Sequence, residues 1–125
     1  MATGDFKAGT GLGGSILAQA QLTTGYVTQY TVPANTYVRL AKVVLCNTSG
    51  SATTVSYGAV KVGGTGGADA ALQAKAIPIG ASGSVTSIID ATELSGLYMG
   101  PGDFLSAKSA GGSAVTITIS GVVSA

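Results

Sequence analysis

The stretch Tyr37–Asn47, which reads YVRLAKVVLCN, decides the fold of this chain. It is the longest run of β-forming residues, and the positions from Val43 to Cys46 are all apolar. A strand with one solvent-exposed face alternates apolar and polar residues, whereas a strand covered on both faces need not. We therefore expect a central strand with a packed layer on each face. We also expect Val44 and Cys46 to be buried.

Two charged residues interrupt the regularity of this central strand. Arg39 and Lys42 stand three positions apart, so a regular strand would place their side chains on opposite faces. We expect either a β-bulge between Arg39 and Lys42 or a strand end near Arg39.

Runs with a period of two flank the central strand on both sides, and turns rich in glycine, proline or asparagine separate them. The predicted strands cover residues 15–22, 26–32, 37–47, 53–62, 77–79, 84–89, 104–109 and 114–123. Residues 68–76 form the only segment compatible with a helix. Strands about 8–12 residues apart without intervening helices are typical of β-sandwiches. The sequence predicts an all-β fold, a single antiparallel β-sandwich of about seven or eight strands, with a jelly roll as one option.

The chain divides into two parts, an extended glycine-rich arm over residues 1–14 and a β-sandwich domain over residues 15–125. A chain of 125 residues supports one hydrophobic core.

The arm offers two apolar anchors, Phe6 and Leu12. Ordering a glycine-rich segment has a high entropic cost, which contacts with another chain would have to offset. We expect Phe6 and Leu12 to insert into a neighbouring subunit, with Asp5 and Lys7 at the rim of the contact. An arm that covers an edge strand of its own sandwich is the alternative.

Charged residues are scarce and scattered. The formal net charge is +1 and 9% of the residues are charged, against about 25% in typical soluble domains. A surface coated by Ser, Thr, Gly, Ala and Gln suits contact with other protein, so we expect a homo-oligomer or a scaffold-bound subunit. A weakly charged monomer is the alternative. Nucleic acid binding requires clustered basic residues, and no run approaches the ~18 apolar residues of a membrane span. We expect neither partner.

The sequence carries little catalytic chemistry. It contains no histidine, which excludes Ser-His and Cys-His nucleophiles and histidine metal sites. Asp90 and Glu93 could pair for glycoside hydrolysis, but their spacing favours a capped turn. Five tyrosines could stack on sugars, although tyrosine in strands is more often found at a core edge or interface. We expect no enzyme activity, no catalytic residues, no cofactor and no metal.

Several short segments together resemble those of small virion proteins of tailed bacteriophages. These segments are Tyr30–Ala34, Val44–Asn47, Gly102–Ser106 and Val115–Gly121. The resemblance covers about residues 15–123, in order, and does not include the arm. It implies a β-sandwich accessory protein that decorates the capsid or is a structural part of the head or tail.

The resemblance implies a non-enzymatic structural role and does not say which part of the virion the protein belongs to. We favour a capsid decoration protein that binds copies of itself, as a trimer by analogy with the family, and the major capsid protein or another virion protein. Such a protein is located in the virion after synthesis in the bacterial host cytoplasm. A tail or fibre component that contacts a host receptor is one alternative. A carbohydrate-binding β-sandwich module is a further alternative from another class.

Overall fold

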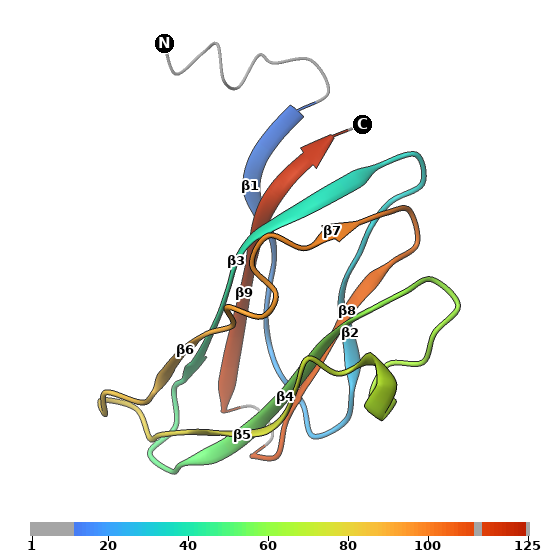
Figure 1. Cartoon of the computed structure of the whole chain (residues 1–125). Helices are drawn as coiled ribbons and strands as arrows, with labels where there is room; N and C mark the ends of the chain where they lie inside the picture. The colour runs from blue at the N-terminus through green and yellow to red at the C-terminus, as the bar shows by residue number, and fades with distance from the viewer. Residues whose placement is uncertain (1–11, 112–113, 125) are drawn as a thin grey trace, which may run out of the picture.

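Strand β3 lies in the middle of one of two antiparallel sheets and has the bounds that the sequence predicted (Figure 1). The computed structural model of the chain describes residues 12–111 and 114–124. The elements in chain order are β1 (Leu12–Gln21), β2 (Val27–Thr31), β3 (Tyr37–Asn47), β4 (Thr53–Val60), the 3-10 helix η1 (Asp69–Ala71), β5 (Ala74–Ile79), β6 (Ile88–Asp90), β7 (Tyr98–Met99), β8 (Phe104–Ser109) and β9 (Val115–Ser124).

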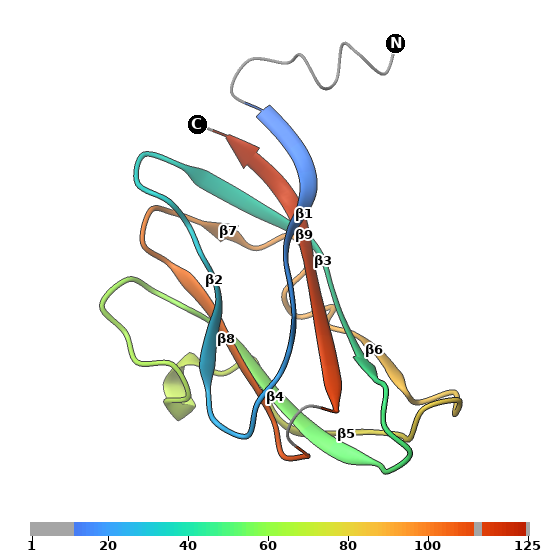
Figure 2. The same cartoon turned by 180° about the vertical axis from the view of Figure 1, so that it is seen from behind.

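The two sheets pack face to face as a sandwich (Figures 1 and 2). Sheet A has the order β1-β9-β3-β6, and β7 pairs with β3; sheet B has the order β2-β8-β4-β5. Every strand pairing among the described residues is antiparallel. This strand order is that of a jelly roll. The predicted all-β antiparallel sandwich is confirmed.

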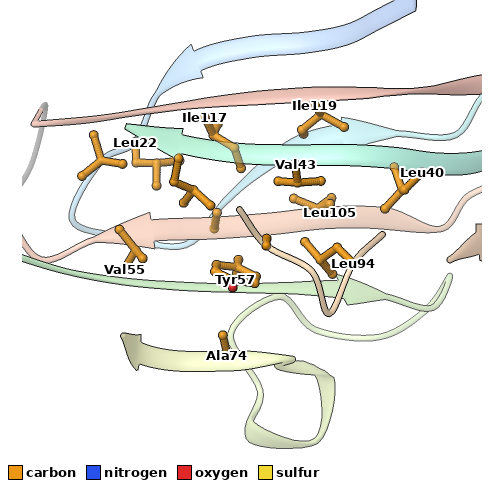
Figure 3. Close-up of a cluster of buried hydrophobic side chains, with 14 of the residues drawn as sticks. Leu22, Leu40, Val43, Val55, Tyr57, Ala74, Leu94, Leu105, Ile117 and Ile119 are labelled. Atoms are coloured by element: carbon orange, nitrogen blue, oxygen red, sulfur yellow. The ribbon is translucent and has the colours of Figure 1, made fainter. Parts of the chain in front are cut away.

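The inner faces of both sheets form one hydrophobic core (Figure 3). Ile117 and Ile119 of β9 are fully buried there, as the alternation of the last strand predicted. From β3, the buried residues are Val43 and Leu45 rather than their neighbours. The aromatic ring of Tyr57 contributes from sheet B.

The prediction that Val44 and Cys46 are buried is wrong, because both are only half-buried. Val44 lies opposite Thr118, and Cys46 lies opposite Thr116. These side chains belong to the face of sheet A that points away from sheet B. The expected second packed layer over β3 is therefore not found among the described residues.

The expected bulge in the central strand is confirmed. The register between β3 and β9 shifts between Leu40 and Lys42. Val38 and Leu40 before the shift and Val43 after it are all buried, while Lys42 is exposed. The extra residue thus keeps the apolar side chains on the inner face and the ammonium group in water.

Three other segments differ from the prediction. Strand β1 begins at Leu12, so residues 12–14 belong to the sheet and not to the arm. Instead of a strand over 84–89, the hydroxyls of Ser84 and Ser87 bond local carbonyls at 2.8 and 2.7 Å, a pattern that favours turns. Residues 68–76 form the short η1 and the start of β5 rather than a longer helix.

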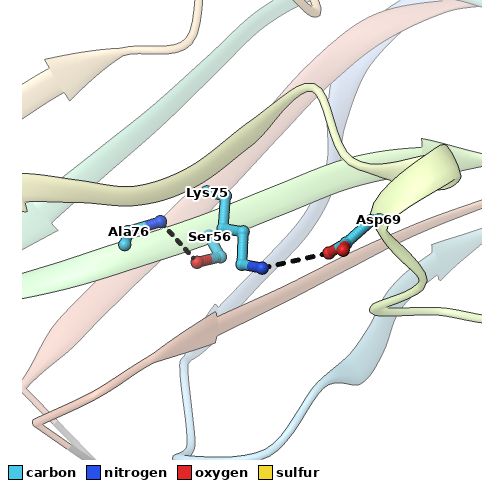
Figure 4. A network of polar contacts seen from close by, with 4 residues as sticks. All are labelled: Ser56, Asp69, Lys75 and Ala76. Carbon is cyan, nitrogen blue, oxygen red and sulfur yellow. Dashed lines mark hydrogen bonds and ion pairs between the residues drawn. The ribbon is translucent and has the colours of Figure 1, made fainter.

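Strand β5 is irregular where it pairs with β4 at the edge of sheet B (Figure 4). Ala76 has a φ of 54°, in the left-handed region, and its N–H donates to Ser56 Oγ at 2.8 Å. Beside it, Lys75 Nζ lies 3.1 Å from Asp69 Oδ1. The left-handed Ala76 and the register shift between Val55 and Tyr57 interrupt the regular ladder at this edge.

Val43 and Val44 provide a matched test of the face assignment. Val43→Ala should lower the free energy of unfolding by about 2–3 kcal/mol, since two buried methyl groups are lost and a cavity remains. Val44→Ala should cost less than about 1 kcal/mol, because its side chain is half-exposed. Denaturant unfolding of the two variants measures both values. Equal costs, or a larger cost for Val44→Ala, would contradict the assignment.

Candidate functional site

The structure describes only one of the four residues predicted to bind a partner, Leu12. Asp5, Phe6 and Lys7 lie outside the described residues. Leu12 opens β1, where its backbone lies opposite Ser124 of β9. The described chain therefore places the junction with the arm at one end of sheet A, beside the end of β9.

The outer face of sheet A is the surface that the described residues leave uncovered by sheet B. Across it, cross-strand pairing groups residues that are far apart in sequence. Ile16 of β1 lies opposite Ser120 of β9, which lies opposite Lys42 of β3. The residues of this face from β1 to β7 are Ile16, Gln19, Gln21, Thr116, Thr118, Ser120, Val122, Ser124, Tyr37, Arg39, Lys42, Val44, Cys46, Ile88, Asp90 and Tyr98.

Large apolar side chains concentrate on this outer face of sheet A. Seven large hydrophobic residues are exposed in the described chain, and four of them lie here. Those four are Ile16 (62% exposed), Tyr37 (62%), Ile88 (60%) and Tyr98 (80%). Tyr37 and Tyr98 lie together at one end of this face, while Ile16 and Ile88 stand apart from them, opposite Ser120 and Cys46. Exposed apolar side chains gathered on one face are typical of contact sites.

The few charges on the outer face of sheet A have neighbours on the same face. Lys42 Nζ lies 3.7 Å from Asp90 Oδ2, and the Arg39 guanidinium lies 5.8 Å from the centroid of the Tyr98 ring. Both are exposed interactions of small energy. A partner could therefore cover this face without leaving an isolated charge at the Lys42–Asp90 pair.

A shallow hollow of about 240 Å³ lies at the end of this face where β1 begins. Its lining consists of Tyr37, Val38, Arg39, Tyr98, Val122 and Ser124. Pockets for drug-sized ligands measure about 300–1,000 Å³, so this hollow suits a single side chain or sugar ring better. Its walls are mainly apolar and aromatic, with one guanidinium.

Asp90 and Glu93 are each tied to another part of the structure. Asp90 faces Lys42, while Glu93 Oε1 accepts a 2.8 Å hydrogen bond from the Tyr57 hydroxyl. The segment between β6 and β7 forms successive turns, in which Glu93 binds Tyr57. Burial first, and then the bond and charge of Glu93, raise the pKa of Tyr57 well above its ordinary value of 10.0.

Searches for a metal site, for a membrane-spanning helix and for similar proteins assign no function to this chain. Over residues 12–111 and 114–124, no three His, Cys, Asp or Glu side chains are grouped so that they could hold a metal ion. In the same part of the chain, no helix is long and apolar enough to cross a membrane. No family model, curated protein or solved structure matches this chain.

Sequence reasoning missed Ile16 and Ile88 as surface residues and anticipated Tyr37 and Tyr98 only as members of a tyrosine set. Ile16 and Tyr98 come onto one face because β1 and β7 flank the β9–β3 pair. Alternation along each strand could have predicted which face of the sheet each residue occupies. The order of strands, which brings these residues together, has no such local signal.

The Tyr57–Glu93 contact predicts a stability change at alkaline pH. The pKa of Tyr57 is raised in the folded state, so as the pH rises the unfolded chain loses the Tyr57 hydroxyl proton before the folded chain does. The contribution of this hydroxyl to the stability of the folded state is therefore complete below pH 10.0 and is lost as the pH rises above it. Tyr57→Phe has no proton to release. The stability advantage of the native protein over this variant should therefore shrink between about pH 8 and about pH 11.

Denaturant unfolding of both proteins at the two pH values measures this advantage. Titration of the remaining tyrosines and lysines affects both proteins and cancels in the difference. An advantage that stays constant or grows with pH would contradict the proposed environment of Tyr57.

Proposed function

We propose that this chain is a non-enzymatic structural subunit of a tailed-phage virion, a capsid decoration protein that associates with copies of itself and binds the shell. The location is the virion, and synthesis takes place in the bacterial host cytoplasm. The arm, with Asp5, Phe6 and Lys7, and the outer face of sheet A are the two surfaces that make the contacts.

The observation that carries this proposal is the composition of the outer face of sheet A. Four large apolar side chains are exposed on a face whose other residues include the polar Gln19, Thr116, Thr118 and Ser120 and the charged Arg39, Lys42 and Asp90. Protein interfaces are enriched in aromatic residues and in arginine. A β-face of this kind supports binding to another protein surface more than binding to nucleic acid or to a charged metabolite.

The fold is consistent with the same function. Jelly rolls occur in viral capsid proteins, in lectins and in cupins, so the fold alone does not select one function. The scarcity of charge, 9% of residues, and the resemblance of the strand sequences to small phage virion proteins favour the capsid among these.

A carbohydrate-binding module is the second candidate, favoured by the hollow at Tyr37, Arg39 and Tyr98. Exposed aromatic rings stack on sugar rings, and a guanidinium can donate hydrogen bonds to hydroxyl oxygens. Binding of the purified protein to a glycan array, with loss of binding in Tyr98→Ala, would favour this candidate over decoration.

Imaging and mass spectrometry of the particle test the proposed function. Decoration predicts many copies distributed over the shell. A few copies confined to the tail would favour the tail or fibre alternative, and absence from purified particles would contradict a structural role in the virion.

Deletion of residues 1–11 tests the arm. The deletion should leave the free energy of unfolding nearly unchanged, because β1 begins at Leu12, and it should abolish attachment to particles that lack the protein. Phe6→Ala in the full chain should weaken attachment, whereas Lys7→Ala, a rim position, should have a smaller effect. Co-sedimentation with particles measures both.

Two results would contradict the anchoring role of the arm. A truncated protein that still attaches normally would exclude it. A truncated protein that unfolds would instead support an arm that covers an edge of its own sandwich.

A further inference from the structure

The four lateral edges of the sandwich differ in how they are protected against pairing with another strand. Exposed edges offer unpaired backbone groups, and proteins usually protect them by short strands, charges, proline or bulges. The strands at these edges are β1 on one side of sheet A, β6 and β7 on the other, and β2 and β5 in sheet B.

Three of these edges carry such protection. β6 and β7 are three and two residues long. β5 contains Lys75, Pro78 and the left-handed Ala76 (Figure 4). β2 has five residues, and its register shifts between Thr28 and Tyr30. A further strand would find only short or interrupted ladders at these places.

Strand β1 lacks most of this protection. It has ten residues, LGGSILAQAQ, without a charge or a proline. Its irregularity is a register shift against β9 between Ile16 and Ala18. Among the described strands, β1 is therefore the one edge that combines length with the absence of charge and proline.

The side chains of β1 are only partly covered: Leu17 and Ala18 are half-buried against the core, and the other residues of 15–21 are exposed. None of the residues 15–21 is buried, and Ala20 is exposed although it lies opposite the buried Ile117. The inner face of β1 thus extends beyond the cover that sheet B provides. Gly121 of β9 lies where β1, β9 and β3 meet. A Cβ atom at this position would lie 2.6 Å from Arg39 O and 3.2 Å from Leu17 Cδ1, so a side chain does not fit there.

The hydrogen-bond pattern shows which backbone groups of β1 point outward. Leu22 N–H donates to Val115 O at 2.8 Å. Bonded and non-bonded pairs alternate in an antiparallel ladder, so the Gln19–Thr118 pair is non-bonded. The N–H and C=O of Gln19 therefore point to the free edge, while its side-chain amide donates to Thr118 Oγ1 at 3.0 Å on the outer face.

We propose that the edge of β1 pairs with β1 of a second copy of this chain, antiparallel and about a twofold axis, so that sheet A continues across two subunits. The partner must supply a free strand of similar length. At a twofold axis the same residues face each other, and β1 brings no charge that would repel its copy. The segment preceding β1 is less suited, since it carries Asp5 and Lys7.

This pairing is independent of the proposed virion role and differs from the trimer expected by analogy with the family. It joins the outer faces of two sheets into one surface and covers the exposed Ile16 of each copy. Main-chain bonds provide the affinity, as in other cases of strand addition.

Sedimentation equilibrium of the full chain tests the proposal. The native protein should be a dimer. Ile16→Lys places like charges across the pair and should raise the dissociation constant about tenfold or more. Gln19→Pro removes the outward N–H and should have the same effect. Gln19→Thr, which loses only the side-chain bond, and Val27→Lys, on the β2 edge, should remain dimers.

Circular dichroism establishes whether each variant folds. If Gln19→Pro does not fold, Ile16→Lys alone tests the β1–β1 pairing. The Gln19 amide should also exchange with solvent more slowly at dimer-forming concentrations. The proposal is overturned by a native monomer at all concentrations, by a dimer that survives Ile16→Lys, or by dissociation in Val27→Lys alone. Dimers that appear only after deletion of residues 1–11 would assign the edge to the chain's own arm.

Discussion

The pairing of β3 with β9 is the constraint on which the rest of the structure depends. Its register places Val43 and Leu45 beside Ile119 and Ile117, and these four side chains form the centre of the core from sheet A. A regular strand that buries Val38 and Leu40 would also bury position 42, where a lysine stands. The bulge changes the parity at that point, so the core remains apolar and the ammonium group of Lys42 stays in water.

The same parity determines the outer face of sheet A. Because Val43 and Leu45 point inward, Val44 and Cys46 must point outward, beside Thr116 and Thr118 of β9. The neighbouring strands then extend this face to Ile16 on one side and to Tyr98 on the other. A core built by one register therefore leaves a broad surface of mixed apolar, polar and charged residues on its other side, and the edge of β1 borders it.

The sequence predicted the fold class and the bounds of β3, and it indicated the bulge as one of two alternatives, because alternation, turn residues and the spacing of Arg39 and Lys42 are local signals. The predicted burial of Val44 and Cys46 is wrong, because four consecutive apolar residues show no alternation that would distinguish the inner face of the sheet from the outer one.

The remaining errors and omissions have non-local causes. Residues 74–76 join β5 because β4 offers a ladder, although their composition suits a helix. The exposed side chains of sheet A meet through the order of strands, and this order depends on packing across the whole domain. The predicted arm residues Asp5, Phe6 and Lys7 lie outside the described chain, so their role remains a prediction.

The account's central claim is that sheet A, by its outer face and its β1 edge, is where this protein meets other protein. Hydroxyl-radical footprinting of the free protein and of the protein mixed with the phage particles that it is proposed to decorate measures this claim directly. Side chains of Tyr37, Ile88 and Tyr98 should become protected, while the exposed Val27, Val62 and Val85 elsewhere on the sandwich should keep their reactivity. Protection of the second group without the first would contradict the claim.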